Sequence, residues 1–216
     1  MSFGRFDESR DAEGNRDFIQ VTRPRPGTTV ISMNRPERMN SMAFEQVIPL
    51  HAALDEVAHD NATGVVILTG SGKGFCSGAD TQGGAPPPNI EGLTAPELGL
   101  SFLLPRAIGS SRAFELMLSG RDIGPVEAAE IGLVSRWVPD ARLLDEALDL
   151  ADQINGWSRN GTQLTKRIMW AGLESGSLAN AIELESRTQL YARLTTQNFE
   201  EAIRARKEKR PPEFKD

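Results

Sequence analysis

The residues of this chain that are best suited to chemistry follow a short apolar run. Residues 65–68 read Val-Val-Ile-Leu, the continuous pattern of a strand buried on both faces, and four glycines come soon after it. Gly78 can take a positive φ, so that the N–H groups of Gly78, Ala79 and Asp80 can point at one acceptor. Such donors suit an oxygen that gains negative charge during a reaction. A plain strand-to-helix turn is the alternative interpretation.

Glu97 is the strongest side-chain candidate. Leucines and a phenylalanine surround it in the sequence. Desolvation by such neighbours disfavours the charged carboxylate and raises its pKa toward the range useful for moving a proton. The sequence allows a structural role equally well, because Pro96 and Glu97 could begin a helix, where an acidic side chain favours the dipole.

Composition argues against several other kinds of site. His51, His59 and the single Cys76 form no cluster with the spacing of a metal site, so we expect a metal-free reaction. The net charge of −6 gives no global basic field that would attract nucleic acid or anionic lipid. No apolar run approaches the ~18 residues of a membrane span. One cysteine cannot form an internal disulfide, which agrees with a reducing compartment, so we expect a cytoplasmic protein.

A predicted hairpin opens the set of elements that must position these residues. Residues 18–22 and 28–33 read as strands, and the sequence Arg-Pro-Arg-Pro-Gly between them suits a turn. A polar loop then leads to a helix predicted over residues 43–59, in which Pro49 predicts a kink or a restart. The order helix, strand, glycine loop predicts a sheet with a functional site at a strand end.

The second half of the chain is predicted to be mostly helical. Residues 110–118 predict a helix capped by Ser110 or Ser111 and ended by Gly120, and residues 124–134 predict a short helix that turns into a strand over residues 133–138. Further helices are predicted over residues 140–154, 161–173, 178–194 and 198–209. We therefore expect a mobile tail over residues 1–17, an α/β core over residues 18–139 and a helical region over residues 140–216.

Two motifs carry a family resemblance. A ten-residue turn, Met33-Asn-Arg-Pro-Glu-Arg-Met-Asn-Ser-Met42, and the loop Phe75-Cys-Ser-Gly-Ala-Asp80 are separated by a helix-sized segment. In this arrangement the chain resembles the crotonase family, the enoyl-CoA hydratases and isomerases, from about residue 18 to residue 214. The resemblance implies an α/β crotonase-like fold, with a ββα spiral core and a C-terminal helical layer that covers the site and builds a homotrimer or hexamer.

The resemblance also implies roles for individual residues. Ala79 matches the position whose N–H is the first oxyanion donor, and Glu97 matches the base of double-bond-shifting isomerases. The substrate would be a 2-enoyl-CoA or 3-enoyl-CoA of fatty acid metabolism, and no cofactor is implied because coenzyme A is part of the substrate. Residues that match CoA-binding positions are Arg38, Met39, Ser41, Gly78, Asp80 and Lys209. For Lys209 the alternative is a solvated basic helix end.

One interval is shorter than the resemblance requires. Only 16 residues separate Asp80 from Glu97, where family members place several tens of residues, including the turn that supplies a second oxyanion donor and a hydratase carboxylate. Loss of one donor would cost of order 3 kcal/mol of transition-state stabilisation, about a hundredfold in rate. Two hypotheses follow: an acyl-CoA-processing enzyme, or a non-catalytic CoA-ester-binding or assembly protein that keeps the scaffold.

Overall fold

The computed structural model describes residues 18–80 and 99–215. The chain forms two compact units, one made of Met1–Gly84 with Asp145–Asp216 and the other of Ala85–Leu144. Glu97 and the short interval before it lie outside the described residues. The expected division into a tail, a core over residues 18–139 and a helical region over residues 140–216 stays a prediction.

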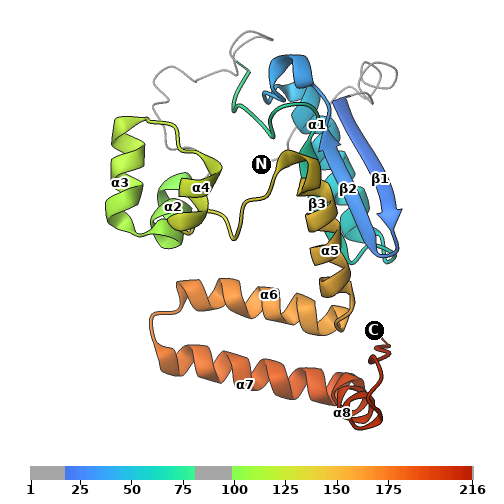
Figure 1. Ribbon diagram of the computed structural model, residues 1–216. Coiled ribbons are helices and arrows are strands. Elements are labelled where there is room, and N and C mark those ends of the chain that lie inside the picture. The colour runs from blue at the N-terminus through green and yellow to red at the C-terminus, as the bar shows by residue number, and fades with distance from the viewer. Residues whose placement is uncertain (1–17, 81–98, 216) are drawn as a thin grey trace, which may run out of the picture. The chain divides into compact units, whose positions relative to one another are not determined.

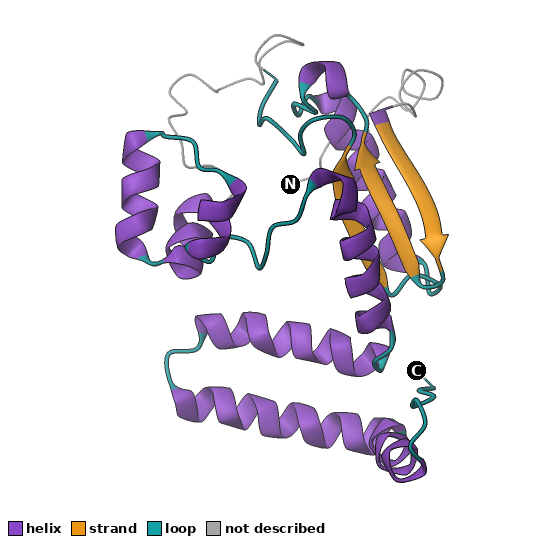
Figure 2. Cartoon of the chain, in the orientation of Figure 1, coloured by secondary structure: helices purple, strands orange, loops and turns teal. Residues whose placement is uncertain are grey.

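A sheet with the order β1-β2-β3 forms the centre of the first unit in the described residues. The strands β1 (Ile19–Arg25) and β2 (Thr28–Met33) form the predicted hairpin, and β3 (Val65–Gly70) lies parallel to β2 (Figures 1 and 2). In the register of the sheet, Ile31 of β2 is paired with Leu68 of β3. Because β2 is the middle strand, nearly all of its side chains are buried.

The helix α1 (Phe44–His59) covers one face of this sheet. The predicted helix is confirmed, and its residues Ala53 and Val57 pack with Ile19, Ile31 and Met33 to form the core. The apolar stripe expected from its sequence is wrong in part, because Val47, Ile48 and Leu54 are exposed and do not belong to this core. The helix continues through Pro49, and the restart that this proline predicted does not occur. Packing of Ala53 and Val57 against the sheet outweighs the loss of a single backbone donor at Pro49.

The prediction that residues 65–68 are buried on both faces is wrong. Val66 is 39% exposed and Leu68 is 41% exposed. The physical reason is their position: the core residues under α1 come from β1 and β2, whereas β3 is the last strand of the described sheet. The apolar run forms a strand as predicted, but the sheet continues no further in the described residues.

Four helices complete the first unit. They are α5 (Leu143–Asn155), α6 (Arg159–Glu174), α7 (Leu178–Thr195) and α8 (Asn198–Glu208), in good agreement with the predicted ranges. The hydroxyl groups of Ser158 and Ser177 cap α6 and α7 by accepting from the N–H groups of Gly161 and Asn180. None of the described helices combines the length and apolar content that a bilayer crossing needs.

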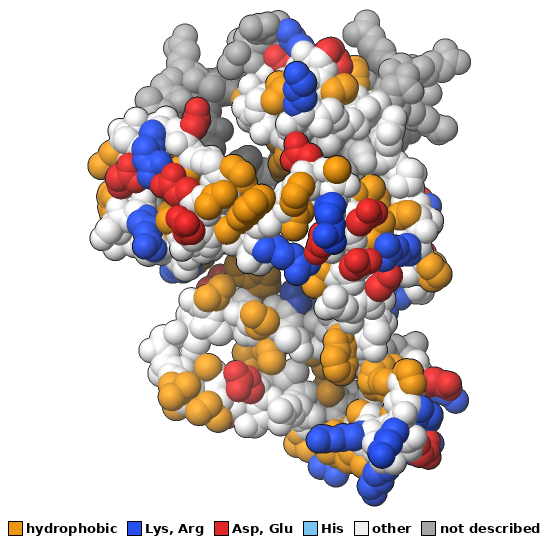
Figure 3. All heavy atoms as spheres, in the orientation of Figure 1, with side chains coloured by type: hydrophobic (Ala, Val, Ile, Leu, Met, Phe, Trp, Pro, Cys, Tyr) orange, Lys and Arg blue, Asp and Glu red, His pale blue; other side chains and the backbone are white. Residues whose placement is uncertain are grey.

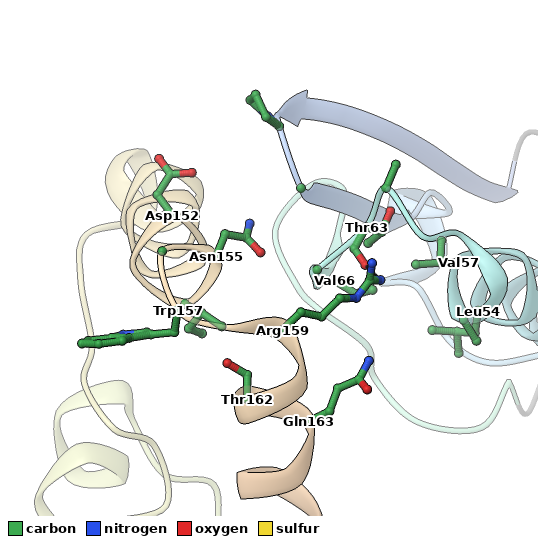
Figure 4. A pocket seen from close by; sticks show the side chains of 17 residues that line it. Leu54, Val57, Thr63, Val66, Asp152, Asn155, Trp157, Arg159, Thr162 and Gln163 are labelled. Atoms are coloured by element: carbon green, nitrogen blue, oxygen red, sulfur yellow. Dashed lines mark hydrogen bonds between the residues drawn. The ribbon is translucent and has the colours of Figure 1, made fainter. Parts of the chain in front are cut away.

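Side-chain contacts join these helices to the sheet. Arg25 pairs with Asp149 at 2.9 Å and Asp152 at 2.6 Å, and the amide of Asn155 donates to Thr28 Oγ1 at 3.0 Å. Arg159 donates to the backbone carbonyl oxygens of Asn61 and Thr63. Figure 4 shows Asn155, Arg159 and Thr63 around the cavity of about 700 Å³ that lies beside these contacts.

The second unit contains three short described helices. They are α2 (Leu100–Ile108), α3 (Ser110–Ser119) and α4 (Pro125–Glu130), and Leu104, Ile108 and Ala113 form their core. Gly120 ends α3 as predicted. The predicted Ser110 or Ser111 cap is wrong, because Gly109 is the N-cap and no side chain caps the helix.

The predicted strand over residues 133–138 is also wrong. These residues form bends and irregular backbone before a short 3-10 turn at Asp140–Arg142. A strand needs a neighbouring strand to accept its backbone hydrogen bonds. The described part of the second unit contains only helices and loops, so the apolar pattern of this segment meets no such neighbour.

Candidate functional site

The glycine loop returns against the end of the strand that precedes it. A Cβ atom on Gly70 would lie 2.5 Å from the carbonyl oxygens of both Gly74 and Phe75. Only glycine permits this approach without a shift of the backbone. The turn after β3 is therefore compact, and it directs residues 75–80 back toward the segment that precedes α1.

A single parallel bridge between Met42 and Ala79 holds the far end of the loop. Met42 N–H donates to Gly78 O at 2.7 Å, and Asp80 N–H donates to Met42 O at 2.9 Å. In such a bridge the N–H and C=O of the middle residue face away from the partner segment. The N–H of Ala79 consequently points outward, and no acceptor for it occurs among the described residues.

The expectation that three amides converge on one acceptor is wrong for Asp80. Its N–H is used in the bridge to Met42. Gly78, which has φ +94°, directs its N–H to the sulfur of Cys76 at 3.4 Å, a weak acceptor that a stronger one could replace. The loop thus offers one unbonded donor at Ala79 and one weakly bonded donor at Gly78.

Asn40 fastens this loop to the turn before α1. Its side chain is fully buried, with 0% exposure. The oxygen Oδ1 accepts the N–H of Arg35 at 2.7 Å, and Nδ2 donates to the carbonyl oxygens of Ser71 at 2.9 Å and Gly74 at 2.7 Å. Asn40 has φ +54°, a left-handed conformation that asparagine tolerates better than most residues.

Ion pairs of Asp80 with Arg35 and Arg38 hold the other end of the loop in place. The side chain of Asp80 is only 3% exposed and lies 2.9 Å from Arg35 Nη1 and 3.4 Å from Arg38 Nη2. The Arg35 contact is close but poorly aligned for a hydrogen bond, so it acts through charge. Arg35 also lies over the ring of Phe18, 5.5 Å from its centroid. A buried carboxylate and two guanidinium groups therefore fix the direction in which the loop leaves Ala79.

The other predicted binding residues lie on this turn or far along the chain. Met39 is exposed, with its side chain near Gly74, and the buried Ser41 donates its N–H to Arg38 O at 3.0 Å. Lys209 ends α8 in a left-handed conformation, with φ +53°. Among the described residues, no hydrogen bond or ion pair connects Lys209 to the loop around Ala79. Glu97 lies outside the described residues, so its predicted role stays a prediction.

Sequence reasoning missed Arg35 and Asn40. Both lie within the motif that carries the resemblance, yet neither was singled out. The sequence did contain a signal for Asn40, because asparagine tolerates left-handed backbone in turns and its side chain forms hydrogen bonds with backbone groups. Two cavities of the first unit, of about 700 and 1010 Å³, are not lined by residues 75–80. The smaller is lined by residues of the β1–β2 turn, α1, β3, α5 and α6, and the larger by residues of α5, α6 and α8.

Comparison with known proteins places these features in a family context. A sequence profile described as Enoyl-CoA hydratase/isomerase matches residues 25–92 and 88–216. The chain is similar to a probable enoyl-CoA hydratase from Mycobacterium bovis, with 42% identity over an alignment that covers 92% of this chain and 93% of the relative.

Solved structures show the same likeness. A probable enoyl-CoA hydratase/isomerase from Mycobacterium abscessus has 41% identity and a TM-score of 0.84, with 92% of this chain and 98% of that chain covered. A monofunctional enoyl-CoA isomerase from M. smegmatis has 41% identity and a TM-score of 0.68, with coverages of 77% and 98%. These likenesses confirm the predicted crotonase-like α/β fold.

The same comparisons show that the chain is internally shorter than its relatives. The alignment with the M. bovis protein is 265 positions long, whereas the chain has 216 residues, so at least 49 residues of that relative have no counterpart here. The family match is split into two segments that meet at residues 88–92. That junction lies inside the interval between Asp80 and Glu97 that the sequence predicted to be short.

Proposed function

This chain belongs to the enoyl-CoA hydratase/isomerase family, and we propose that it binds an acyl-CoA thioester and stabilises the enolate that forms from it. The observation that carries the proposal is the backbone N–H of Ala79, which the Met42 bridge turns outward and which has no acceptor among the described residues. A donor that is fixed before the reaction stabilises developing negative charge without a reorganisation cost.

The proposed chemistry then needs one group that moves a proton. We assign this step to Glu97, as the sequence resemblance implies. The carboxylate would take a proton beside the thioester carbonyl and return it two carbons away, which converts a 3-enoyl-CoA to a 2-enoyl-CoA. Hydration of a 2-enoyl-CoA is the related reaction, and it requires a water molecule held by a carboxylate. Both belong to fatty acid metabolism, and neither needs a cofactor beyond the coenzyme A of the substrate.

Coenzyme A would lie along the turn before α1. Arg38 is partly exposed and carries a planar guanidinium that matches a phosphate in forked geometry. Because the Asp80 carboxylate is buried against Arg35 and Arg38, we propose that it orients Arg38 toward the phosphates. The main-chain groups of Met39, Ser41 and Gly78 would line the channel, and Lys209 would meet a phosphate.

The helical layer of the first unit supports the proposed homotrimer or hexamer. Figure 3 shows hydrophobic side chains on the visible face of α6 and α7 and a cluster of Lys and Arg on α8. Large apolar side chains with more than half of their surface exposed include Met169, Trp170, Leu178, Leu190 and Leu194. Such a surface is typical of an interface between subunits. A cytoplasmic location is part of the same proposal.

A pair of variants at one position tests the proposed donor. Ala79→Pro removes the N–H, whereas Ala79→Gly keeps it. We expect kcat of the proline variant to fall about 10²-fold, because one oxyanion donor is lost, and kcat of the glycine variant to stay near that of the parent protein. The assays are hydration of crotonyl-CoA at the enone absorbance and isomerisation of a 3-enoyl-CoA. Equal kcat values for the two variants, both folded, would refute the assignment of Ala79.

The residues of the M. bovis relative that have no counterpart in this chain favour a second candidate function, a non-catalytic CoA-ester-binding or assembly protein with a degraded site. Intact mass spectrometry first establishes that the purified protein has the mass of this 216-residue sequence. A protein of that mass that binds CoA esters in a calorimetric titration, but turns over neither substrate, has the second function. Turnover of either substrate that responds to Ala79→Pro supports the enzyme.

A further inference from the structure

The outer edge of β3 is an open strand edge in the described part of the chain. On its inner side, Val65 N–H donates to Gly27 O and Ser71 N–H donates to Met33 O. Alternate residues of a strand direct their backbone groups to opposite edges. The N–H and C=O groups of Val66 and Leu68 therefore point outward, where no described strand pairs with them.

The opposite edge of the described sheet, formed by β1, has features that prevent pairing with another strand, and β3 lacks them. The strand β1 carries Arg23, Pro24 and Arg25, and its register with β2 is irregular between Thr22 and Arg25. Charge, proline and irregular register are devices that prevent another strand from adding to an edge. The strand β3, Val-Val-Ile-Leu-Thr-Gly, has none of them.

The residues whose backbone groups point outward, Val66 and Leu68, also have exposed apolar side chains. Val66 and Leu68 lie on the face of the sheet that α1 covers further along, because they are paired with Thr29 and Ile31 of β2. Their exposed fractions of 39% and 41% are large for an uncharged strand of the interior type. At least 49 residues of the M. bovis relative have no counterpart in this chain, and the family match is split after β3. In the described part of the chain, β3 is thus an edge strand although its sequence is typical of an interior strand.

We propose that β3 pairs with β3 of a second copy of this chain, antiparallel about a twofold axis through Ile67. If the twofold axis is normal to the sheet, one residue of each β3 must lie on the axis. Only then do the side chains that face each other across the two strands point to the same side of the sheet. With Ile67 at the centre, Val66 faces Leu68 of the second copy, and the outward groups of these residues form four backbone hydrogen bonds. Gly70, on which the loop folds back, stays outside the pairing.

The second copy is the occupant that this edge fits best. No charged side chain lies on β3, so an antiparallel copy brings no like charges together, and the two Val66 and Leu68 pairs join into one apolar strip. Because the described sheet of each copy has one open edge and one protected edge, the contact closes as a dimer and does not propagate into a fibre. The pairing requires neither acyl-CoA binding nor turnover, and its test is independent of the proposed function.

Molar mass in solution tests the contact. Leu68→Lys places a charge in the apolar strip and leaves the β2 side of the strand untouched, and we expect it to halve the mass measured by size exclusion with light scattering. Val21→Lys on β1 is the matched control, since Val21 is also exposed, at 36%, but lies on the strand at the opposite edge of the described sheet. Association through α6 and α7 contributes equally to all three proteins. Equal masses for the parent protein and folded Leu68→Lys would overturn the proposal.

Cysteine crosslinking tests the register in a Cys76→Ala background. A residue on the axis lies in a non-hydrogen-bonded pair, with a Cα–Cα distance of about 4.5 Å, which a disulfide can span. We expect Ile67→Cys to give a disulfide dimer on mild oxidation. Thr69→Cys, whose counterpart in the second copy is Val65, should stay monomeric under denaturing, non-reducing electrophoresis. A crosslink at residue 69 without one at residue 67, or none at either, contradicts the pairing about Ile67.

Discussion

Replacement of Asn40 tests how the loop that carries Ala79 is held in place. Asn40 is fully buried and bonds to three backbone groups, the N–H of Arg35 and the carbonyl oxygens of Ser71 and Gly74. Two variants separate its two roles. Asn40→Gly removes the side chain at a φ of +54° that glycine adopts without strain, whereas Asn40→Ala removes it and adds backbone strain.

The expected magnitude follows from these contacts. Each lost hydrogen bond costs about 1 kcal/mol net, so Asn40→Gly should lower the free energy of unfolding by about 3 kcal/mol. Left-handed backbone at a residue with a Cβ costs about 1 kcal/mol more, which brings Asn40→Ala to about 4 kcal/mol. Such a loss is a large fraction of the 5–15 kcal/mol that stabilises a typical domain. Asn40→Asp keeps the bond from Arg35 N–H but places a buried carboxylate oxygen against the carbonyl oxygens of Ser71 and Gly74, so it should cost at least as much as Asn40→Gly.

Urea titrations monitored by circular dichroism measure these differences, and amide hydrogen exchange of residues 71–80 shows whether the loop is released. Asn61→Ala is the matched control, because Asn61 is an exposed asparagine of the same unit and should change the free energy of unfolding by less than about 0.5 kcal/mol. If Asn40→Gly and Asn61→Ala had the same stability and the same exchange rates, the reasoning about the Asn40 contacts would be refuted.

Two further predictions concern charged groups of the same unit. Hydrogen bonds from Arg210 and from the N–H of Glu213 lower the pKa of Glu201 to about 2, so the contribution of Glu201 to stability is present above pH 4.5 and is lost as the pH falls toward 2. The urea midpoint, measured from pH 6 to pH 3, should therefore decline less steeply for Glu201→Gln than for the parent protein. Equal slopes for the two proteins would contradict this prediction. Arg35→Ala should cost about 3 kcal/mol in urea unfolding, because it removes the shorter of the two arginine contacts of the buried Asp80. Arg38→Ala, which removes the longer and more exposed contact, should cost about 1 kcal/mol. The reverse order of the two costs would show that Arg38 is the main partner of Asp80.

The sequence by itself determined the local elements and the identity of the loop. Strand and helix ranges such as residues 28–33 and 178–194 follow from patterns that neighbouring residues impose on one another, because propensity, periodicity and turn chemistry act over a few residues. The position of Ala79 after an apolar strand and a run of glycines was readable for the same reason. The internal shortening was also visible, as a spacing between two motifs.

Only the tertiary structure decided which backbone groups are occupied. The bridge from Met42 uses the N–H of Asp80 and leaves that of Ala79 outward, and this depends on two segments separated by a helix and a strand. The burial of Asn40 and Asp80 and the exposure of Val66 and Leu68 depend in the same way on which elements lie beside them. Burial and hydrogen-bond pairing are relations between distant segments, so a single sequence proposes the groups that can react and the fold determines which of them are free to do so.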